Sequence, residues 1–149
     1  MAVALTVPEH GASFAGATAA IAGATPRALE TARGLAQTLG MRSVEVADRD
    51  RAAYHAAASI ASNFLVTLEG AAERLAATAG VEREALAPLV RATVENWAQH
   101  GAHKAITGPI ARGDETTVTR QREAVAERVP DLLPLWDALV ESTRGLVPA

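Results

Sequence analysis

The sequence predicts a mostly α-helical protein that is preceded by a short α/β segment. Apolar residues recur at helical spacing from Asp48 nearly to the C-terminus, whereas the residues up to Ala47 follow the order strand–helix–strand. Aromatic residues make up only 3% of the 149 residues, so the core must consist of small aliphatic side chains, which allow helices to approach closely. We therefore expect two parts, residues 1–47 and 48–149.

The first part predicts a small α/β unit at the edge of a larger sheet. Short strands are expected over residues 1–7, 18–22 and 42–46. Thr25 and Pro26 predict the N-cap and first position of an intervening helix, which Gly40 ends. Because so few strands cannot form a stable sheet alone, we expect an N-terminal domain or a second copy of the chain to cover the edge.

The second part predicts helices throughout. They are expected over residues 48–78, 83–99, 115–128 and 131–145. Asp48 and Asp114 are the predicted N-caps of the first and third, and Pro88 is expected to kink the second or delay its regular part. Residues 101–114 predict a short helix or turn, followed by a loop rich in Gly and Pro.

Composition argues against several classes of function. The net charge is -3 and the 14 basic residues are scattered, which argues against nucleic-acid binding. The absence of cysteine excludes disulfides and thiolate chemistry, and fits a reducing compartment. No apolar stretch reaches the roughly 20 residues that span a bilayer, and the N-terminus does not resemble a signal peptide. We expect a cytoplasmic protein without a metal site, in which the histidines near residue 100 lie at the surface.

The most informative pattern is a polar row on the first long helix. At about 100° per residue, its four hydrogen-bonding side chains fall within one sector of an otherwise apolar helix: His55, Ser59, Ser62 and Asn63. A buried network in which these groups satisfy one another, or the wall of a polar pocket, would explain such a row. As a pocket wall, His55 has the intrinsic pKa, about 6.5, to pass a proton near neutrality, and Asn63 would orient a carbonyl or hydroxyl oxygen.

Two further groups are candidate substrate contacts. Thr93 and Asn96 share a face of the next helix with His100, which is typical either of a helix-packing stripe or of the second wall of a cleft. Arg112 lies in the loop over residues 107–114, where turn chemistry and a helix cap explain the other residues. An arginine at that position would either grip a carboxylate or phosphate, or pair with an acid at the surface.

Motifs for a nucleotide or a nucleophile are not found. No G-x-G-x-x-G follows a strand, so the sequence predicts no cofactor-binding residues of its own, and no G-x-S-x-G occurs. Three segments nevertheless resemble a known family in the correct order: residues 50–63, 89–96 and 107–114. They resemble the C-terminal domain of the predicted Rossmann-like oxidoreductases, long labelled a domain of unknown function, and the resemblance extends from about Phe14 to the C-terminus.

The resemblance implies a helical fold similar to the C-terminal domain of 6-phosphogluconate dehydrogenase and ketopantoate reductase. The short α/β segment would then be the end of a Rossmann domain. Full-length members carry an N-terminal NADP- or NAD-binding domain and commonly dimerise through the helical half. Ketopantoate reductase places a lysine and asparagines at i, i+4 and i+8; His55, Ser59 and Asn63 occupy those positions here. Because the lysine is absent, a histidine would have to donate the proton.

Three functions remain open on these grounds. The leading one is the substrate-binding and dimerisation half of an NAD(P)-dependent oxidoreductase that acts on a small 2-oxo or hydroxy acid. Its predicted catalytic residues are His55 and Asn63, and Ser59, Ser62, Thr93, Asn96 and Arg112 are its predicted substrate contacts. On that reading the chain alone is not expected to bind a cofactor or transfer hydride. The alternatives are a non-catalytic homodimeric interaction domain and a small-carboxylate-binding module.

Overall fold

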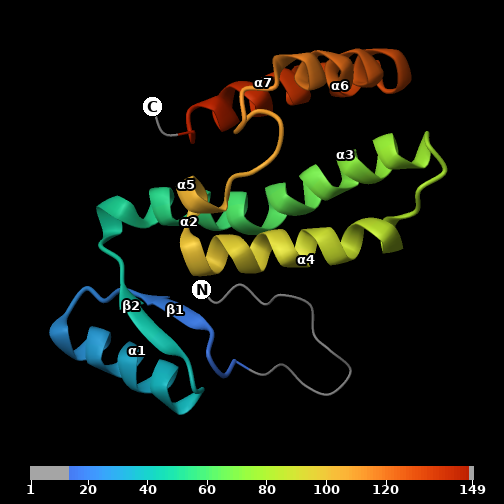
Figure 1. Cartoon of the computed structure of the whole chain (residues 1–149). Helices are drawn as coiled ribbons and strands as arrows, with labels where there is room; N and C mark the ends of the chain where they lie inside the picture. The colour runs from blue at the N-terminus through green and yellow to red at the C-terminus, as the bar shows by residue number, and fades with distance from the viewer. Residues whose placement is uncertain (1–13, 148–149) are drawn as a thin grey trace. The chain divides into compact units, whose positions relative to one another are not determined.

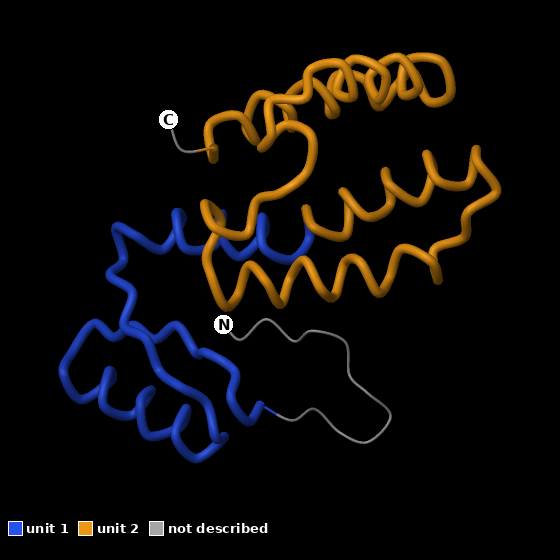
Figure 2. The backbone as a smooth tube through the Cα atoms, viewed as in Figure 1, with its two compact units in different colours: residues 1–63 blue, residues 64–149 orange. Residues whose placement is uncertain are grey.

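The chain forms two compact units. The structure, a computed structural model, describes residues 14–147, and the units comprise residues 1–63 and 64–149 (Figure 2). The predicted strand over residues 1–7 lies outside the described residues. Helices dominate the described part of the chain, which confirms the predicted fold class (Figure 1). The predicted functional division near Ala47 stays a prediction.

The first unit is built on a strand–helix–strand motif. Its elements are β1 (Thr18–Ile21), α1 (Pro26–Thr38) and β2 (Arg42–Glu45). The strands are parallel, with Thr18 opposite Arg42 and Ile21 opposite Glu45. The predicted cap is confirmed, because the Thr25 side chain accepts a 3.2 Å hydrogen bond from the backbone N–H of Ala28.

This first unit has a very small core. Ile21 and Ala36 are its buried apolar residues among those described, whereas Leu35 and Leu39 on α1 are 61% and 51% exposed. A sheet of two strands offers too little surface to cover a helix. The apolar residues of α1 therefore exceed what the described strands bury.

The helical segment that follows corrects one prediction. The sequence predicted a single helix over residues 48–78, but the structure divides it among four consecutive parts: a 3₁₀ turn (Asp48–Asp50), α2 (Arg51–Ser59), a π-helical turn (Ile60–Phe64) and α3 (Leu65–Ala77). Asp48 does not cap it, since its carboxylate pairs with the Arg51 side chain. A π turn differs from an α turn by one additional residue and has no composition of its own, so periodicity analysis treats it as regular helix.

The second unit is helical. Besides α3 it contains α4 (Arg83–His100), α5 (Ala102–Ala105), α6 (Glu115–Arg128), a 3₁₀ turn (Pro130–Leu132) and α7 (Leu133–Arg144). These bounds confirm the predicted helices, although the last begins with the 3₁₀ turn and α4 continues through Pro88. Helix α3 lies beside α4, and α6 packs against α7 (Figure 1).

Valines form the core of the second unit. Val118 and Val125 on α6, Val129 after it and Val140 on α7 are buried, and Val125 is only 2% exposed. Full burial of a valine contributes about 1.5–3 kcal/mol. The contact between α6 and α7 is therefore the best-packed apolar region of the part of the chain described.

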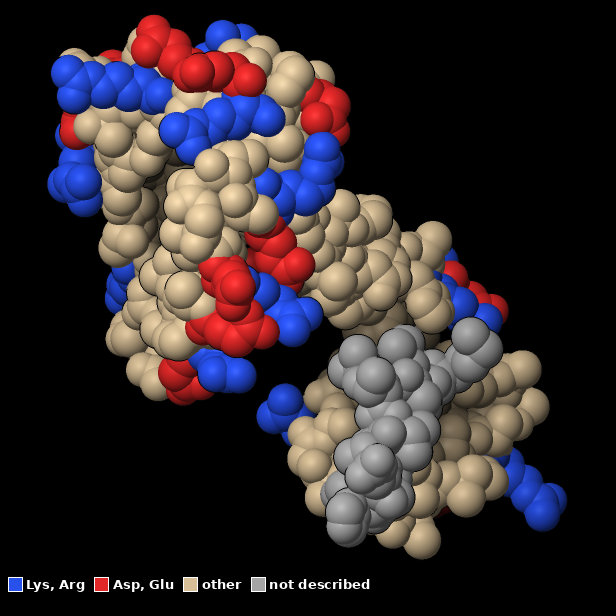
Figure 3. Space-filling view, turned by 90° about the vertical axis from the view of Figure 1, so that its right-hand side faces the viewer, with Lys and Arg blue, Asp and Glu red and all other residues tan. Residues whose placement is uncertain are grey.

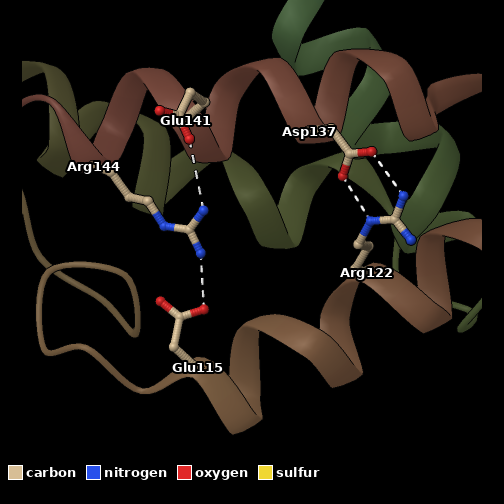
Figure 4. A network of polar contacts seen from close by, with 5 residues as sticks. All are labelled: Glu115, Arg122, Asp137, Glu141 and Arg144. Carbon is tan, nitrogen blue, oxygen red and sulfur yellow. Dashed lines mark hydrogen bonds and ion pairs between the residues drawn. The ribbon is translucent and has the colours of Figure 1, made fainter.

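Ion pairs join the same two helices (Figure 4). Arg122 donates from Nε and Nη2 to the two carboxylate oxygens of Asp137, each at 2.8 Å, and Arg144 lies 2.8 Å from Glu115 and 3.7 Å from Glu141. The Arg122 hydrogen bonds hold the pKa of Asp137 below its ordinary value. These side chains are about half exposed, so we expect them to fix the pairing of α6 with α7 more than to add stability.

On the face that Figure 3 presents, charged side chains do not gather by sign. Figure 3 shows Lys and Arg interspersed with Asp and Glu on the face it presents. A further pair, Arg74 with Asp131, joins the end of α3 to the 3₁₀ turn before α7 at 2.8 Å. Mixed signs of this kind are typical of a solvated surface and not of a phosphate-binding stripe.

Candidate functional site

Two residues of the polar row lie on α2. His55 and Ser59 are four residues apart, so they project from one face of that helix. His55 is exposed, and its ring meets that of Tyr54 edge-on, with the centroids 6.0 Å apart and the planes at 76°. Ser59 is half-buried. This arrangement leaves the imidazole accessible and places a hydroxyl one turn further along.

The other two row residues lie in the π turn. Ser62 is half-buried, and its hydroxyl donates a 2.7 Å hydrogen bond to the backbone carbonyl of Ala58. Asn63 is exposed. The Ser62 contact is the bond to the preceding turn that the buried-network alternative anticipated. Ser62 thus has a backbone role that needs no substrate.

The second predicted group lies on α4, in the other compact unit. Thr93 is exposed, whereas the Asn96 side-chain amide donates to the Ala105 carbonyl at 3.3 Å and so links α4 to α5. Nδ1 of His100 lies 3.1 Å from the carbonyl oxygen of Asn96. The Asn96 contact favours the packing alternative for that residue. Because the two groups belong to different units, a cleft between them stays a prediction.

Arg112 lies in the turn between α5 and α6. Gly108 and Gly113 on either side have φ values of +96° and +66°, and the Arg112 N–H donates to the Pro109 carbonyl at 3.2 Å. The backbone of the turn is thereby fixed, while the guanidinium is on an exposed residue. A rigid backbone that carries an exposed arginine suits recognition of an anion, and both alternatives for this residue stay open.

The helix after this turn begins at the cap that the sequence predicted. The Asp114 carboxylate accepts hydrogen bonds from the Thr117 hydroxyl at 2.7 Å and from its backbone N–H at 3.0 Å. These bonds are the main cause that lowers the pKa of Asp114, and the nearby charge of Arg112 lowers it further. Arg112 therefore acts on a neighbouring acid through its charge.

Two hollows in the structure were not predicted from the sequence. One, of about 420 Å³, lies at the carboxyl ends of β1 and β2 in the first unit. It is lined by Ala22, Gly23, Ala24, Glu45, Val46, Ala47, Asp48 and Arg51. The other, of about 330 Å³, is an apolar groove between α3 and the α6–α7 pair. The strand order could have indicated the first, because ligands of parallel sheets bind at that edge. Neither hollow is lined by a predicted site residue.

The turn at this strand edge does not fit a nucleotide pyrophosphate. Such a group needs free backbone N–H groups at the start of a helix. Here the Thr25 side chain occupies the N–H of Ala28, Pro26 has no N–H, and a Cβ on Gly23 would lie 2.5 Å from the backbone nitrogen of Leu29. Gly23 thus serves the close packing of the chain on its own helix.

Neither a candidate metal site nor a helix that could span a membrane is found among the described residues. Within residues 14–147, no group of three His, Cys, Asp or Glu side chains could hold a metal ion. His103 instead has its Nδ1 atom 2.9 Å from the Leu146 carbonyl oxygen. Across the same residues, no helix combines the length and the apolar character that crossing a bilayer requires.

Comparison with known proteins decides the family. The model of the family described as "Domain of unknown function (DUF2520)" matches residues 17–143. The chain belongs to this family. The match covers most of the chain and confirms the resemblance expected from the three sequence segments. No protein with a curated function matches.

Two solved structures share the fold of this DUF2520 chain. One is "putative NADP oxidoreductase BF3122" from Bacteroides fragilis, with a TM-score of 0.72 and 22% identity over 82% of this chain and 47% of that one. The other is protein TM1727 from Thermotoga maritima, with a TM-score of 0.74 and 27% identity over 82% of this chain and 50% of that one. The DUF2520 chain therefore spans about half the length of these relatives.

Proposed function

We propose that the chain is the substrate-binding and dimerisation half of an NAD(P)-dependent oxidoreductase that acts on a small 2-oxo or hydroxy acid. The observation that carries this proposal is the shared fold with a protein named as an NADP oxidoreductase, of which the chain spans 47%. Membership of the DUF2520 family supports it. An oxidoreductase of this kind needs a nucleotide-binding half, which the described residues do not include.

The cofactor belongs to that other half. The β1–α1 turn is capped and closely packed, so it offers no cradle for a pyrophosphate. NADP or NAD would therefore be held elsewhere in the complete protein, and turnover by this chain alone is not expected. The role of this chain would then be to bind the substrate and to exchange a proton with it.

The predicted site residues other than Ser62 each have a role in this proposal. His55 would exchange a proton with the carbonyl or hydroxyl oxygen of the substrate, since an exposed imidazole on α2 can reach a bound ligand. Asn63 would orient that oxygen, and Ser59 would supply a further hydrogen bond. Arg112 would bind the carboxylate with two parallel N–H groups. Thr93 and Asn96, on α4, would be further hydrogen-bonding contacts of the substrate.

A second copy of the chain is the proposed partner. Large apolar side chains are exposed on several helices: Leu35, Leu39, Ile60, Phe64, Val66, Leu89, Val94, Trp97 and Leu139. Tryptophan is enriched among the residues that dominate protein interfaces, and larger exposed apolar patches mark interaction sites. Multi-angle light scattering of the chain is expected to give twice the monomer mass, and a monomer at all concentrations would contradict this part of the proposal.

The catalytic part is tested with His55→Ala in a polypeptide that carries both halves. Because His55 would supply the proton, kcat for reduction of a 2-oxo acid is expected to fall by about 100-fold or more. The matched control is His103→Ala, which removes another exposed histidine of the chain and should leave kcat unchanged. Unaltered turnover of all accepted substrates by His55→Ala would refute the acid role.

The exposed apolar side chains also favour a second candidate function, a non-catalytic homodimeric interaction domain. Thermal-shift measurements with pyruvate, oxalate and lactate separate this candidate from substrate binding. A ligand that binds the native state raises the melting temperature, by an amount that grows with its concentration. A dimer that responds to none of these acids would favour the interaction domain.

A further inference from the structure

The π turn over Ile60–Phe64 interrupts the polar row. An α turn closes with hydrogen bonds between residues four apart, whereas a π turn closes with bonds between residues five apart. One more residue is therefore accommodated between Ser59 in α2 and Leu65 in α3. Such turns are rare and occur frequently at functional sites. This one contains Asn63, the residue proposed to orient the substrate oxygen.

The wider turn changes where Asn63 points. In a regular α-helix four residues rotate by about 40° more than a full turn. The side chain of Ser59 would therefore point about 40° away from that of His55, and Asn63 about 40° further in the same direction. A turn with one more residue reduces this drift at the second step. Asn63 then lies closer to the line set by His55 and Ser59 than a continuous α-helix would place it.

A side chain within the turn supports this geometry. The Ser62 hydroxyl donates to the Ala58 carbonyl at 2.7 Å, and Ser62 is half-buried. A widened turn alters the pairing of backbone carbonyls at its start, and a serine that bonds the carbonyl four residues back is a known cause of helix distortion. Ser62 is thus bonded to the backbone at the place where α2 gives way to the π turn.

Apolar packing does not explain the turn. Its first and last residues, Ile60 and Phe64, are 62% and 56% exposed. A hydrogen bond from the Ser62 hydroxyl connects the turn to α2, through the backbone carbonyl of Ala58.

We propose that Ser62 is a positioning residue: its hydroxyl holds the π turn in which Asn63 is aligned with His55 and Ser59. This inference rests on the proposed function, because alignment matters only if the three side chains meet one ligand. It gives Ser62 a different role from the direct substrate contact that the sequence suggested. The ligand of the aligned row would be a small 2-oxo acid, with its carbonyl oxygen between the imidazole and the amide.

The decisive variants are Ser62→Ala and Ser62→Thr. In a polypeptide with both halves, Ser62→Ala is expected to lower kcat for a 2-oxo acid by about 10- to 100-fold with little change in KM, because small misplacement of a reacting group is costly. Ser62→Thr keeps a hydroxyl that can bond the same carbonyl and should restore kcat to within a few-fold. Ser142→Ala is the matched control, since Ser142 makes the same bond to Ala138, at 2.8 Å, in α7.

A second measurement does not depend on catalysis. In the 149-residue chain, the side-chain amide resonance of Asn63 is expected to shift in Ser62→Ala and to return in Ser62→Thr, while Ser142→Ala leaves it unchanged. Amide hydrogen exchange over residues 60–64 should also accelerate in Ser62→Ala alone.

The outcomes separate this inference from the proposed function. If Ser62→Ala keeps full kcat and an unshifted Asn63 resonance while His55→Ala and Asn63→Ala lose activity, Ser62 does not position the row but the function stands. If Ser62→Ala loses activity and Ser62→Thr does not recover it, Ser62 contacts the substrate directly and the inference is wrong. If His55→Ala and Asn63→Ala are both fully active, the proposed function itself fails.

Discussion

The two compact units differ in how far they complete their own packing. In the first, α1 and two parallel strands bury Ile21 and Ala36 and leave Leu35 61% exposed. In the second, α6 and α7 bury a set of valines, and ion pairs join the same helices (Figure 4). The second unit therefore has a core of its own, while the described residues of the first bury little apolar surface. This difference is expected if residues 1–47 are the end of a nucleotide-binding domain, which stays a prediction.

The largest effect should come from the core of the second unit. Val125→Ala removes two methyl groups from the most completely buried valine, which is 2% exposed. We expect it to lower the free energy of unfolding by about 2–3 kcal/mol. Val66→Ala is the matched control, because Val66 is 72% exposed and its loss should cost less than about 0.5 kcal/mol. Urea denaturation measures both, and equal losses would show that the valine core is not what stabilises this unit.

A glycine pair tests the packing of the first unit. Gly23→Ala would place a Cβ 2.5 Å from the backbone nitrogen of Leu29, so we expect a destabilisation of about 1–3 kcal/mol. Gly34→Ala, within α1, meets no atom within 4 Å and should stabilise the chain by about 0.5–1 kcal/mol through helix propensity. The two variants should thus shift the melting temperature in opposite directions. A shift in the same direction would show that the turn after β1 is looser than the structure indicates.

The smallest effect concerns the ion pairs of the second unit. The Arg122 guanidinium holds the pKa of Asp137 below its ordinary value of about 3.9. A carboxylate with a lowered folded-state pKa stabilises the fold above its unfolded-state pKa, and this contribution is lost as the pH falls through the folded-state pKa. Stability of wild type should therefore fall below about pH 4, and Asp137→Asn should weaken this dependence. Melting curves between pH 2 and 7 measure it, and identical profiles for the two proteins would contradict the assignment.

Sequence periodicity was sufficient where elements are regular. Thr25 before Pro26 and Asp114 before α6 were recognised as caps because a cap depends on a few neighbouring residues. Order and type of the other helices followed from apolar spacing in the same way. The geometry of the polar row was harder to predict, because it depends on a π turn that differs from regular helix by a single residue.

The sequence also does not predict which hydrogen-bond or ion-pair partner each side chain meets. The hydrogen bond of Asn96 to Ala105 and that of Ser62 to Ala58 decide whether each side chain serves the backbone, and Arg122 meets Asp137 fifteen residues later in the chain. Spacing can place a residue on a helix face but does not determine what lies opposite that face. The strand-end hollow was missed for the same reason.

By itself the sequence determined the family, the helical class and the helix caps at Thr25 and Asp114, because these depend on local spacing and on short motifs. Only the tertiary structure decided which valines form a core, which polar groups are occupied and where the long helix widens. Those properties arise when segments distant in the sequence meet, or when the backbone accommodates one residue more than its periodicity allows.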